Sequence, residues 1–423
     1  MVVGGRVDVV TRTSRKEQVV IAGAGPVGMT AALALACRGI PVTVLEAVPS
    51  LPTDLRGSTF HPPTFEMLAA VGVADRLIAE GLRVDKFQFR GRSGGIVAEM
   101  DMGLLKHDTP FPFRLQCPQH RLTAIILDRL KALDHAEVRF DHMVVGVTQD
   151  GEGATAICES GAGTREVRGA YLLGADGAGS NVRKSLEIEF EGMTYPVRYL
   201  LLNSTYPFEN HFPGLGLVNY IFDPGEWVVL LRVPGIWRIL FPVPLSEPED
   251  VAMSEGRVQE RLRRLTSTEA DFEVSYRHVW RVHQRVATTY RKDRALLLGD
   301  AAHINSPIGG MGMNSGIHDA IFLADRLRTV LQDRASDAPL DEYAAVRRGV
   351  ALEFVRAASH KNTADLEKKE GELWAQRNAE YAGIAADPTL AYEYVRRSSM
   401  LTSLKGLQAG RLGGRAEVER CRT

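Results

Sequence analysis

Four residues near the start of the chain have types and a spacing that suit a phosphate-binding turn. Gly23, Gly25, Pro26 and Gly28 belong to the sequence GAGPVG, which contains the pattern G-x-G-x-x-G. In such a turn the first glycine permits a tight bend, the second lets the backbone approach a pyrophosphate, and the third lets a helix pack closely on a strand. The open amides at the helix N-terminus attract the phosphate charge. The four residues therefore predict dinucleotide binding.

The flanking sequence predicts the elements that must position this turn. QVVIAG before it is short and β-branched, like a buried parallel strand, and residues 27–37 after it are rich in Ala and Leu, like a packed helix. A second strand, PVTVLEA, reaches Glu46 close to the spacing at which a carboxylate binds a ribose 2′-hydroxyl. Two plainer interpretations are a membrane helix over this uncharged stretch and a βαβ core without a ligand. The glycines and the proline weigh against the membrane helix.

Two aspartates later in the chain each follow an apolar strand. Asp176 comes after YLLGA, and Asp300 comes after RALLLG. A carboxylate at such a place can accept hydrogen bonds from a polyol. Beyond Asp300, the glycines of residues 309–312 allow the backbone to lie against a flat ring, and the helix that starts near Met313 would direct the positive end of its dipole at a reduced isoalloxazine. Each motif alone has a plainer interpretation, because strand-end aspartates cap helices and glycine clusters form turns.

Composition limits the classes of function. The chain has 423 residues with 45% hydrophobic residues, a formal net charge of −1 and a pI of about 6.9, so no general field favours nucleic acid or an anionic membrane. The N-terminal residues 1–18 carry charges where a signal peptide needs an apolar segment. Cys37, Cys117, Cys158 and Cys421 lie far apart without a C-x-x-C pair, which argues against a disulfide framework and a zinc site and predicts a cytoplasmic protein.

The order of elements predicts two interleaved domains. Segments of βαβ type alternate along the chain with segments of antiparallel strands. A nucleotide-binding domain that is interrupted by a β-rich second domain would explain this order. The sequence predicts a helix over 63–81, a hairpin over 84–102 turning at Gly94 and Gly95, a helix over 119–133, a three-strand meander over 138–171, strands over 190–286 with a helical insert at 258–265, and helices after Asn314.

Together the three motifs resemble the group A flavoprotein monooxygenases, the family of para-hydroxybenzoate hydroxylase. The resemblance covers about residues 18–366 and rests on GAGPVG, GADGAGSNVRK and GDAAHINSPIGGMGMNSGIHDA. It implies an α/β fold in which a glutathione-reductase-type FAD-binding Rossmann domain is interleaved with an α+β substrate domain and followed by a helical tail. The expected boundaries are 17–85, 116–187 and 287–360 for the FAD-binding domain, 86–115 and 188–286 for the substrate domain, and 361–423 for the tail.

The resemblance also implies which residues contact FAD. Asp176 and Gly177 would be linked to both FAD and the nicotinamide nucleotide. Thr123 departs from the pattern, because many phenol hydroxylases carry a glutamate there, four residues after the glutamine. The implied FAD-binding residues are Gly23, Gly25, Pro26, Gly28, Glu46 and Ala47 at the adenosine side, Arg56 and Gln119 near the pyrophosphate and ribityl chain, Gly299 and Asp300 at the ribityl chain, and Pro307, Gly310, Gly312, Met313 and Asn314 near the flavin ring.

The implied activity is hydroxylation of a phenolic or hydroxylated heteroaromatic substrate through a flavin C4a-hydroperoxide, with O₂ and with NADH or NADPH as a transient reductant. Pro307 would lie near the oxygen chemistry, and Arg238 would help to govern flavin movement. Tyr220 and His211 are candidates for a phenol-proton relay, because both side chains donate and accept. Their plainer interpretation is a tyrosine packed on the sheet and a histidine in a surface loop. In the same way, His303 would support the cofactor loop, and Arg232 would either meet a substrate carboxylate or lie exposed on its strand.

Alternatives to hydroxylation remain at this stage. The same fold could carry out ring-opening oxygenation, epoxidation, halogenation or reduction, although only Trp237 matches the tryptophan motif of halogenases. A non-catalytic flavin-binding protein is the alternative outside enzymes. The charged helix over 364–381 is predicted to be a solvated face, with a homodimer contact as the lesser possibility.

Overall fold

The computed structural model describes residues 17–53, 57–92, 95–223, 225–333, 336–367 and 371–404. Its first layer is a six-stranded sheet in the order β18-β19-β12-β1-β2-β8. β1 lies parallel to β12 and β2, and only β18 runs antiparallel to its neighbour. The strands are β1 (Val19–Ala22), β2 (Val42–Leu45), β8 (Ala136–Arg139), β12 (Tyr171–Gly174), β18 (Arg291–Lys292) and β19 (Ala295–Leu297).

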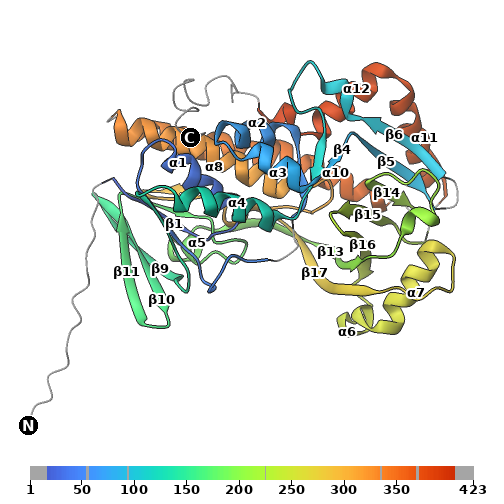
Figure 1. Ribbon diagram of the computed structural model, residues 1–423, viewed down its shortest axis with the longest axis horizontal. Coiled ribbons are helices and arrows are strands. Elements are labelled where there is room, and N and C mark those ends of the chain that lie inside the picture. The colour runs from blue at the N-terminus through green and yellow to red at the C-terminus, as the bar shows by residue number, and fades with distance from the viewer. Residues whose placement is uncertain are drawn as a thin grey trace, which may run out of the picture.

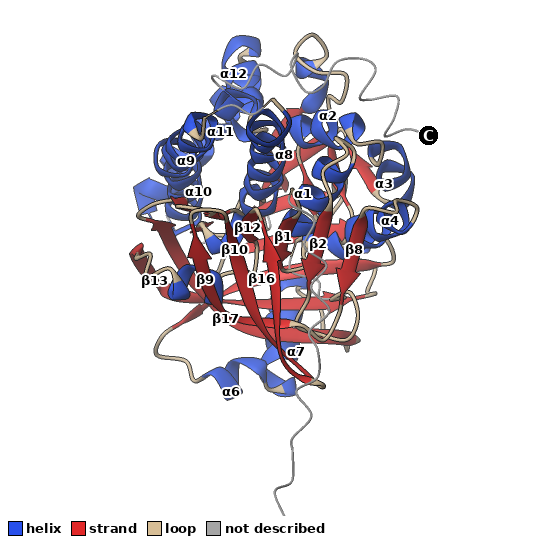
Figure 2. Cartoon of the chain, turned by 90° about the vertical axis from the view of Figure 1, so that its left-hand side faces the viewer, coloured by secondary structure: helices blue, strands red, loops and turns tan. Residues whose placement is uncertain are grey.

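Helices cover one face of this parallel sheet. Figure 2 shows α1 (Pro26–Ala36), α4 (Gln119–Lys131) and α8 (Met311–Gln332) on the same side of β1, β2 and β8. Nine of the eleven residues of α1 are buried, and α1 packs between α4 and α8. Its Ala-rich sequence allows this close packing, because small side chains let neighbouring backbones approach. The uncharged stretch that could have been a membrane helix is therefore a buried strand, a turn and a buried core helix.

The second layer is an eight-stranded sheet in the order β20-β17-β13-β16-β15-β14-β5-β6. Figure 1 shows the long strands β13 and β17 running from the end of the molecule that carries β9 (Met143–Asp150), β10 (Gly153–Ser160) and β11 (Gly163–Gly169) toward the end that carries α6 (Glu249–Met253) and α7 (Glu255–Thr266). The strands are β5 (Lys86–Gly91), β6 (Gly95–Asp101), β13 (Phe190–Ser204), β14 (Val218–Phe222), β15 (Val228–Val233), β16 (Ile236–Pro244), β17 (Val274–Ala287) and β20 (His303–Ile304).

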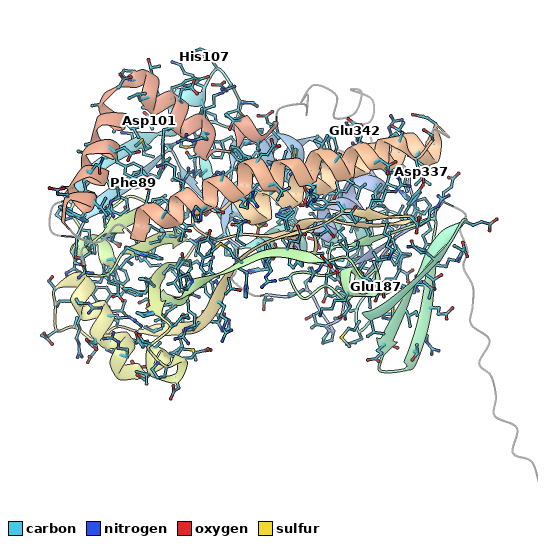
Figure 3. All side chains as sticks on the ribbon, turned by 180° about the vertical axis from the view of Figure 1, so that it is seen from behind. Phe89, Asp101, His107, Glu187, Asp337 and Glu342 are labelled. Carbon is cyan, nitrogen blue, oxygen red and sulfur yellow. The ribbon has the colours of Figure 1, made fainter. Side chains whose placement is uncertain are left out.

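The last helices lie over β5 and β6. They are α10 (Arg356–Glu367), α11 (Gly371–Ala386) and α12 (Pro388–Ser398), and α11 contacts β6. Figure 3 places Phe89 of β5 beside these helices, at the opposite end of the molecule from Asp337 and Glu342. Asp365, Arg377 and Tyr381 are all buried. The prediction of a simply solvated helix over 364–381 is therefore wrong, because its inner side chains pack on the second sheet.

Most predicted elements are confirmed, with changes at their boundaries. The predicted helix over 63–81 is two helices, α2 (Pro62–Ala70) and α3 (Ala74–Glu80), because Gly72 turns the chain with a φ of +73°. The hairpin is β5–β6; Gly94 lies outside the described residues. The meander comprises β9 (Met143–Asp150), β10 (Gly153–Ser160) and β11 (Gly163–Gly169), while both ends of the predicted segment belong to the parallel sheet. The α/β fold with a second, β-rich part is confirmed.

Two further findings concern the cysteines and the helices. Cys117 and Cys158 are free and buried, but Cys37 is disulfide-bonded, so the expectation that excluded disulfides is wrong at that position. Cys421 lies outside the described residues. Of the helices that the structure describes, none is both long enough and apolar enough to cross a membrane.

Candidate functional site

The glycine turn after β1 has the geometry that its sequence predicts. Gly23 adopts a φ of +99°, and a Cβ there would lie 2.5 Å from the carbonyl oxygen of Ala175. A Cβ on Gly28 would lie 2.0 Å from the carbonyl oxygen of Gly23, which is why α1 packs so closely on the turn. A Cβ on Gly25 would meet no atom within 4 Å, and Gly25 and Pro26 line a large cavity. The turn is therefore a tight bend with one open glycine, as a pyrophosphate requires.

Glu46 follows β2 and hydrogen-bonds to the backbone of the glycine turn. Its Oε2 accepts a hydrogen bond of 2.7 Å from the amide of Ala24, and its Oε1 accepts one of 3.2 Å from the amide of Val48. The side chain is buried, and neither Glu46 nor the exposed Ala47 lines the large cavity. Arg56 lies outside the described residues.

Asp176 caps a helix in this structure. Its carboxylate accepts hydrogen bonds from the Ser180 hydroxyl, at 2.6 Å, and from the Val182 amide, at 3.0 Å, at the start of α5 (Asn181–Ser185). Gly177 has a φ of +78° and lines the cavity. The contacts of Asp176 are therefore those of a helix cap, which is its plainer interpretation, while Gly177 forms part of the cavity wall.

Asp300 lies exposed at the cavity wall, and a buried network fixes the backbone before it. The Gly299 amide donates to Asp319 Oδ2 at 3.1 Å, and the His303 ring nitrogen Nε2 lies 2.9 Å from the same oxygen. Arg347 Nε donates to Asp319 Oδ1 at 2.6 Å. The expectation that His303 supports this loop agrees with these contacts. Asp319, on α8, and Arg347, on α9 (Ala338–Val350), were missed, because only the packing of these two helices brings them together near Gly299.

The glycine-rich loop forms the next part of the wall. Pro307, Gly309, Gly310, Gly312 and Met313 all line the cavity. Gly310 has a φ of +67° and precedes α8, whose 22 residues place the positive end of a helix dipole at this loop.

Asn314 shapes that loop without lining the cavity. It accepts from the amide of His61 at 2.9 Å and donates to the carbonyl oxygens of Thr59, at 2.8 Å, and of Gly310, at 2.7 Å. His61 Nε2 in turn contacts the carbonyl oxygen of Gly309 at 2.9 Å. Burial lowers the pKa of His61 to about 3, so the ring is neutral and Nε2 can donate to that carbonyl. His61 is a further residue that sequence reasoning missed.

Gln119 and Thr123, from the first turns of α4, line the cavity near the glycine loop. A Cβ on Gly57 would lie 2.6 Å from Gln119 Oε1 and 3.0 Å from Met313 Sδ. The absence of a side chain at Gly57 therefore leaves room for both.

The second sheet forms the far part of the same cavity, whose volume is about 350 Å³. Tyr220 and the buried Arg238 line it, together with Arg114, which sequence reasoning missed. The rest of the chamber is mainly apolar. Its apolar lining residues are Leu201, Val218, Val229, Leu231, Leu240, Trp280, Ile304 and Ile308.

His211 and Arg232 lie outside this chamber. His211 Nε2 contacts the Tyr206 hydroxyl at 2.7 Å, and the two rings stack. Arg232 lies over the ring of Trp237, 5.4 Å from its centroid. Neither residue lines the large cavity, so the structure does not bring His211 together with Tyr220.

The cavity as a whole fits FAD. Gly25 and Gly177 leave open space for a pyrophosphate, since a Cβ at either would meet nothing within 4 Å. The carboxylate of Asp300 lies at the wall where a ribityl chain can donate to it, and the start of α8 can face a flavin ring. Gln119 adds a polar side chain beside that path.

Comparisons with known proteins agree with this geometry. The FAD binding domain family matches residues 16–358. Para-nitrophenol 4-monooxygenase from a Pseudomonas species is 35% identical over 353 residues, which are 81% of this chain and 86% of that protein. 6-Hydroxy-3-succinoylpyridine 3-monooxygenase from Pseudomonas putida is 34% identical over 364 residues, 85% of this chain and 91% of that protein.

A solved structure shows the same similarity. That of p-nitrophenol 4-monooxygenase from Pseudomonas putida has a TM-score of 0.86 at 31% identity and covers 90% of this chain and 99% of its own. The expected FAD cofactor and aromatic hydroxylase class are confirmed. The chain belongs to the FAD-binding family of aromatic monooxygenases and is an FAD-dependent enzyme that hydroxylates aromatic compounds.

Proposed function

We propose that this enzyme hydroxylates a phenol of a single ring, with O₂ as the oxygen source and NADH or NADPH as a transient reductant. The observation that carries this proposal is that one cavity of about 350 Å³ is lined both by the glycines at its FAD side, Gly25, Gly177 and Gly310, and by the apolar chamber that holds Tyr220. A chamber that shares this volume with a flavin ring favours a compact substrate. The relatives named above act on nitrophenol and on a hydroxylated pyridine, which are compact rings with a hydroxyl group.

Bound FAD supplies the electron transfer and oxygen activation in this proposal. The chain contributes the surroundings. Apolar side chains of β14 to β16 exclude water from the reacting atoms, and Pro307 and Ile308 close the chamber at the glycine loop. The start of α8 stabilises negative charge at the loop. The Tyr220 hydroxyl is the group that meets the substrate hydroxyl, because it lines the chamber and can both donate and accept.

The proposed domains separate the residues that bind FAD from those that form the substrate chamber. We infer an FAD-binding domain of residues 17–85, 116–187 and 287–360, a substrate domain of 86–115 and 188–286, and a helical tail from 361. The six-stranded and eight-stranded sheets fall mainly into these two domains, and the last boundary cuts into α10. The cytoplasm, which supplies NADH and NADPH, is the proposed place of action, and a homodimer is the proposed assembly.

Rapid-mixing reduction of the purified protein tests the proposal. The flavin absorbance between about 350 and 500 nm is followed after mixing with NADH or NADPH, across a panel of phenols and pyridine carboxylic acids. We expect faster reduction with one class of phenol and a product that is one oxygen atom heavier. Tyr220→Phe should slow turnover, while Tyr206→Phe, outside the chamber, should not. Equal reduction with every compound and no oxygenated product would contradict the proposal.

A further inference from the structure

The direct contacts that the structure describes for the Arg114 guanidinium come from uncharged groups. It belongs to β7 (Arg114–Gln116) and is 2% exposed. Its guanidinium carbon lies 3.9 Å from the centroid of the Phe87 ring, and its Nη2 donates to the Ser398 hydroxyl at 3.2 Å. The Tyr220 hydroxyl also lies close enough to the guanidinium to act on its charge. All of these partners are uncharged.

No carboxylate among the described residues pairs with this guanidinium. Its Nε has no hydrogen-bond partner there, and the oxygens that act on its charge are those of Tyr220 and Tyr394. Burial lowers the pKa of Arg114 from its usual value, because the charged guanidinium is less stable away from water. A buried charge without an opposite charge is strongly unfavourable. An anion that binds beside Arg114 would remove this cost.

The position of Arg114 indicates where such an anion would lie. The side chain lines both the large cavity and a second cavity of about 30 Å³. Tyr220, Tyr381 and Tyr394 also line the small cavity, and so does the buried carboxylate of Asp365, which pairs with Lys361 at 2.9 Å and accepts from the Tyr381 hydroxyl at 3.1 Å. A space of this size is about the volume of one water molecule, so it accommodates a single oxygen atom more readily than a carboxylate. The apolar chamber on the other side of Arg114 accommodates the ring.

We propose that Arg114 binds the substrate as a phenolate, with the Tyr220 hydroxyl as a second donor to the same oxygen. This proposal rests on the proposed function, because it requires a phenol in the chamber. On binding, the O–H bond of the phenol breaks, its electron pair stays on the oxygen, and the proton passes to water. The positive charge favours the ionised ring, which is the more nucleophilic form that accepts an oxygen atom. Arg114 is thus a catalytic residue.

The ionisation of a bound phenol tests this role without turnover. The probe is 4-nitrophenol, whose phenolate absorbs at longer wavelength than its phenol, added to the FAD-loaded enzyme without reductant. A pH titration of the difference spectrum gives the pKa of the bound probe. We expect this pKa to lie at least about one unit below that of free 4-nitrophenol. In Arg114→Met it should rise above the free value, because the apolar chamber remains while the charge is gone. Arg232→Met, an arginine outside the chamber, should behave like the wild type.

Three results would overturn the proposal. The first is seen with the wild-type enzyme alone: either 4-nitrophenol does not bind, or its pKa when bound is at or above that of the free probe. The second is an unchanged pKa in Arg114→Met. The third is a selective loss of 4-hydroxybenzoate affinity in that variant without a change in the probe's pKa, which would assign Arg114 to a carboxylate. If Arg114→Met does not retain FAD, Arg114→Gln replaces it. A lowered pKa in an enzyme that forms no oxygenated product would refute the proposed function alone.

Discussion

Removing the charge of Asp319 tests the network that holds the Gly299–Asp300 wall. In Asp319→Asn, Arg347 would lose the carboxylate that its Nε contacts at 2.6 Å, and both side chains of this pair are fully buried. The Gly299 amide and the His303 ring would also lose a charged acceptor. We expect lower stability and weaker FAD binding, because the loop that carries Asp300 rests on these contacts.

The size of the effect follows from the charges. Burial opposes the ionised form of Asp319, but the charge of Arg347 together with His303 outweighs it and lowers the pKa from 3.8 to about 2. A shift of about two units corresponds to roughly 2.5 kcal/mol, present above pH 3.8 and lost as the pH falls toward 2. The substitution also leaves Arg347 buried and unpaired, which raises the expected cost to about 3–5 kcal/mol. With an unfolding entropy of about 2.1 cal/mol/K per residue, Tm should fall by about 3–6 °C.

Thermal unfolding of the FAD-loaded proteins, followed by flavin fluorescence and by circular dichroism, measures this change. Asp325→Asn is the matched control, because Asp325 lies on the same helix and pairs with Arg326 near the surface; its Tm should stay within about 1 °C. The double variant Asp319→Asn with Arg347→Met should regain part of the loss, since it removes the unpaired charge. A Tm for Asp319→Asn equal to that of the control would refute the reasoning.

Three other predictions concern the glycine turn and two buried histidines. Gly28→Ala places a Cβ 2.0 Å from a carbonyl oxygen, so Tm and FAD content should fall, whereas Gly151→Ala, in open space, should change neither. Gly25→Val should leave the Tm of the apoprotein unchanged but weaken FAD binding at least about tenfold, as measured by fluorescence titration, because its side chain enters the open space that a pyrophosphate would occupy. Burial lowers the pKa of both His61 and His318 to about 3, so unfolding takes up protons below pH 6.5. Stability should therefore fall from pH 6.5 to pH 5, and His318→Gln should reduce the slope of Tm against pH.

The parts of the site that depend on local backbone could be predicted from the sequence. Gly23, Gly25 and Gly28 each meet a requirement set within a few residues of the turn, and the same holds for Gly309 and Gly310, whose φ values are positive. Such requirements leave a readable pattern of glycines between a strand and a helix.

The directions of side chains and the contacts between residues far apart in the chain leave no such local pattern in the sequence. Val218 and Tyr220 face the chamber because alternate residues of β14 share one face, whereas His211 lies before the strand and packs on Tyr206. Asp176 could equally have bound a ligand or capped a helix, and only the fold around Ser180 decides this. The chamber residue Arg114 meets Ser398 of α12, which is 284 positions away in the chain, so no local window contains both.

The order of the parallel sheet has a consequence for biosynthesis. β1 pairs with β12, which begins at Tyr171, and β12 pairs with β19, which begins at Ala295. A ribosome that adds about 5–20 residues per second emits β1 roughly 8–30 s before β12 and needs about 6–25 s more to reach β19. During that interval the apolar strand Val19–Ala22 lacks one of its partners, and α1 lacks α8. The nascent chain therefore holds an exposed apolar strand and helix for tens of seconds, which makes it a client for chaperones that bind during translation.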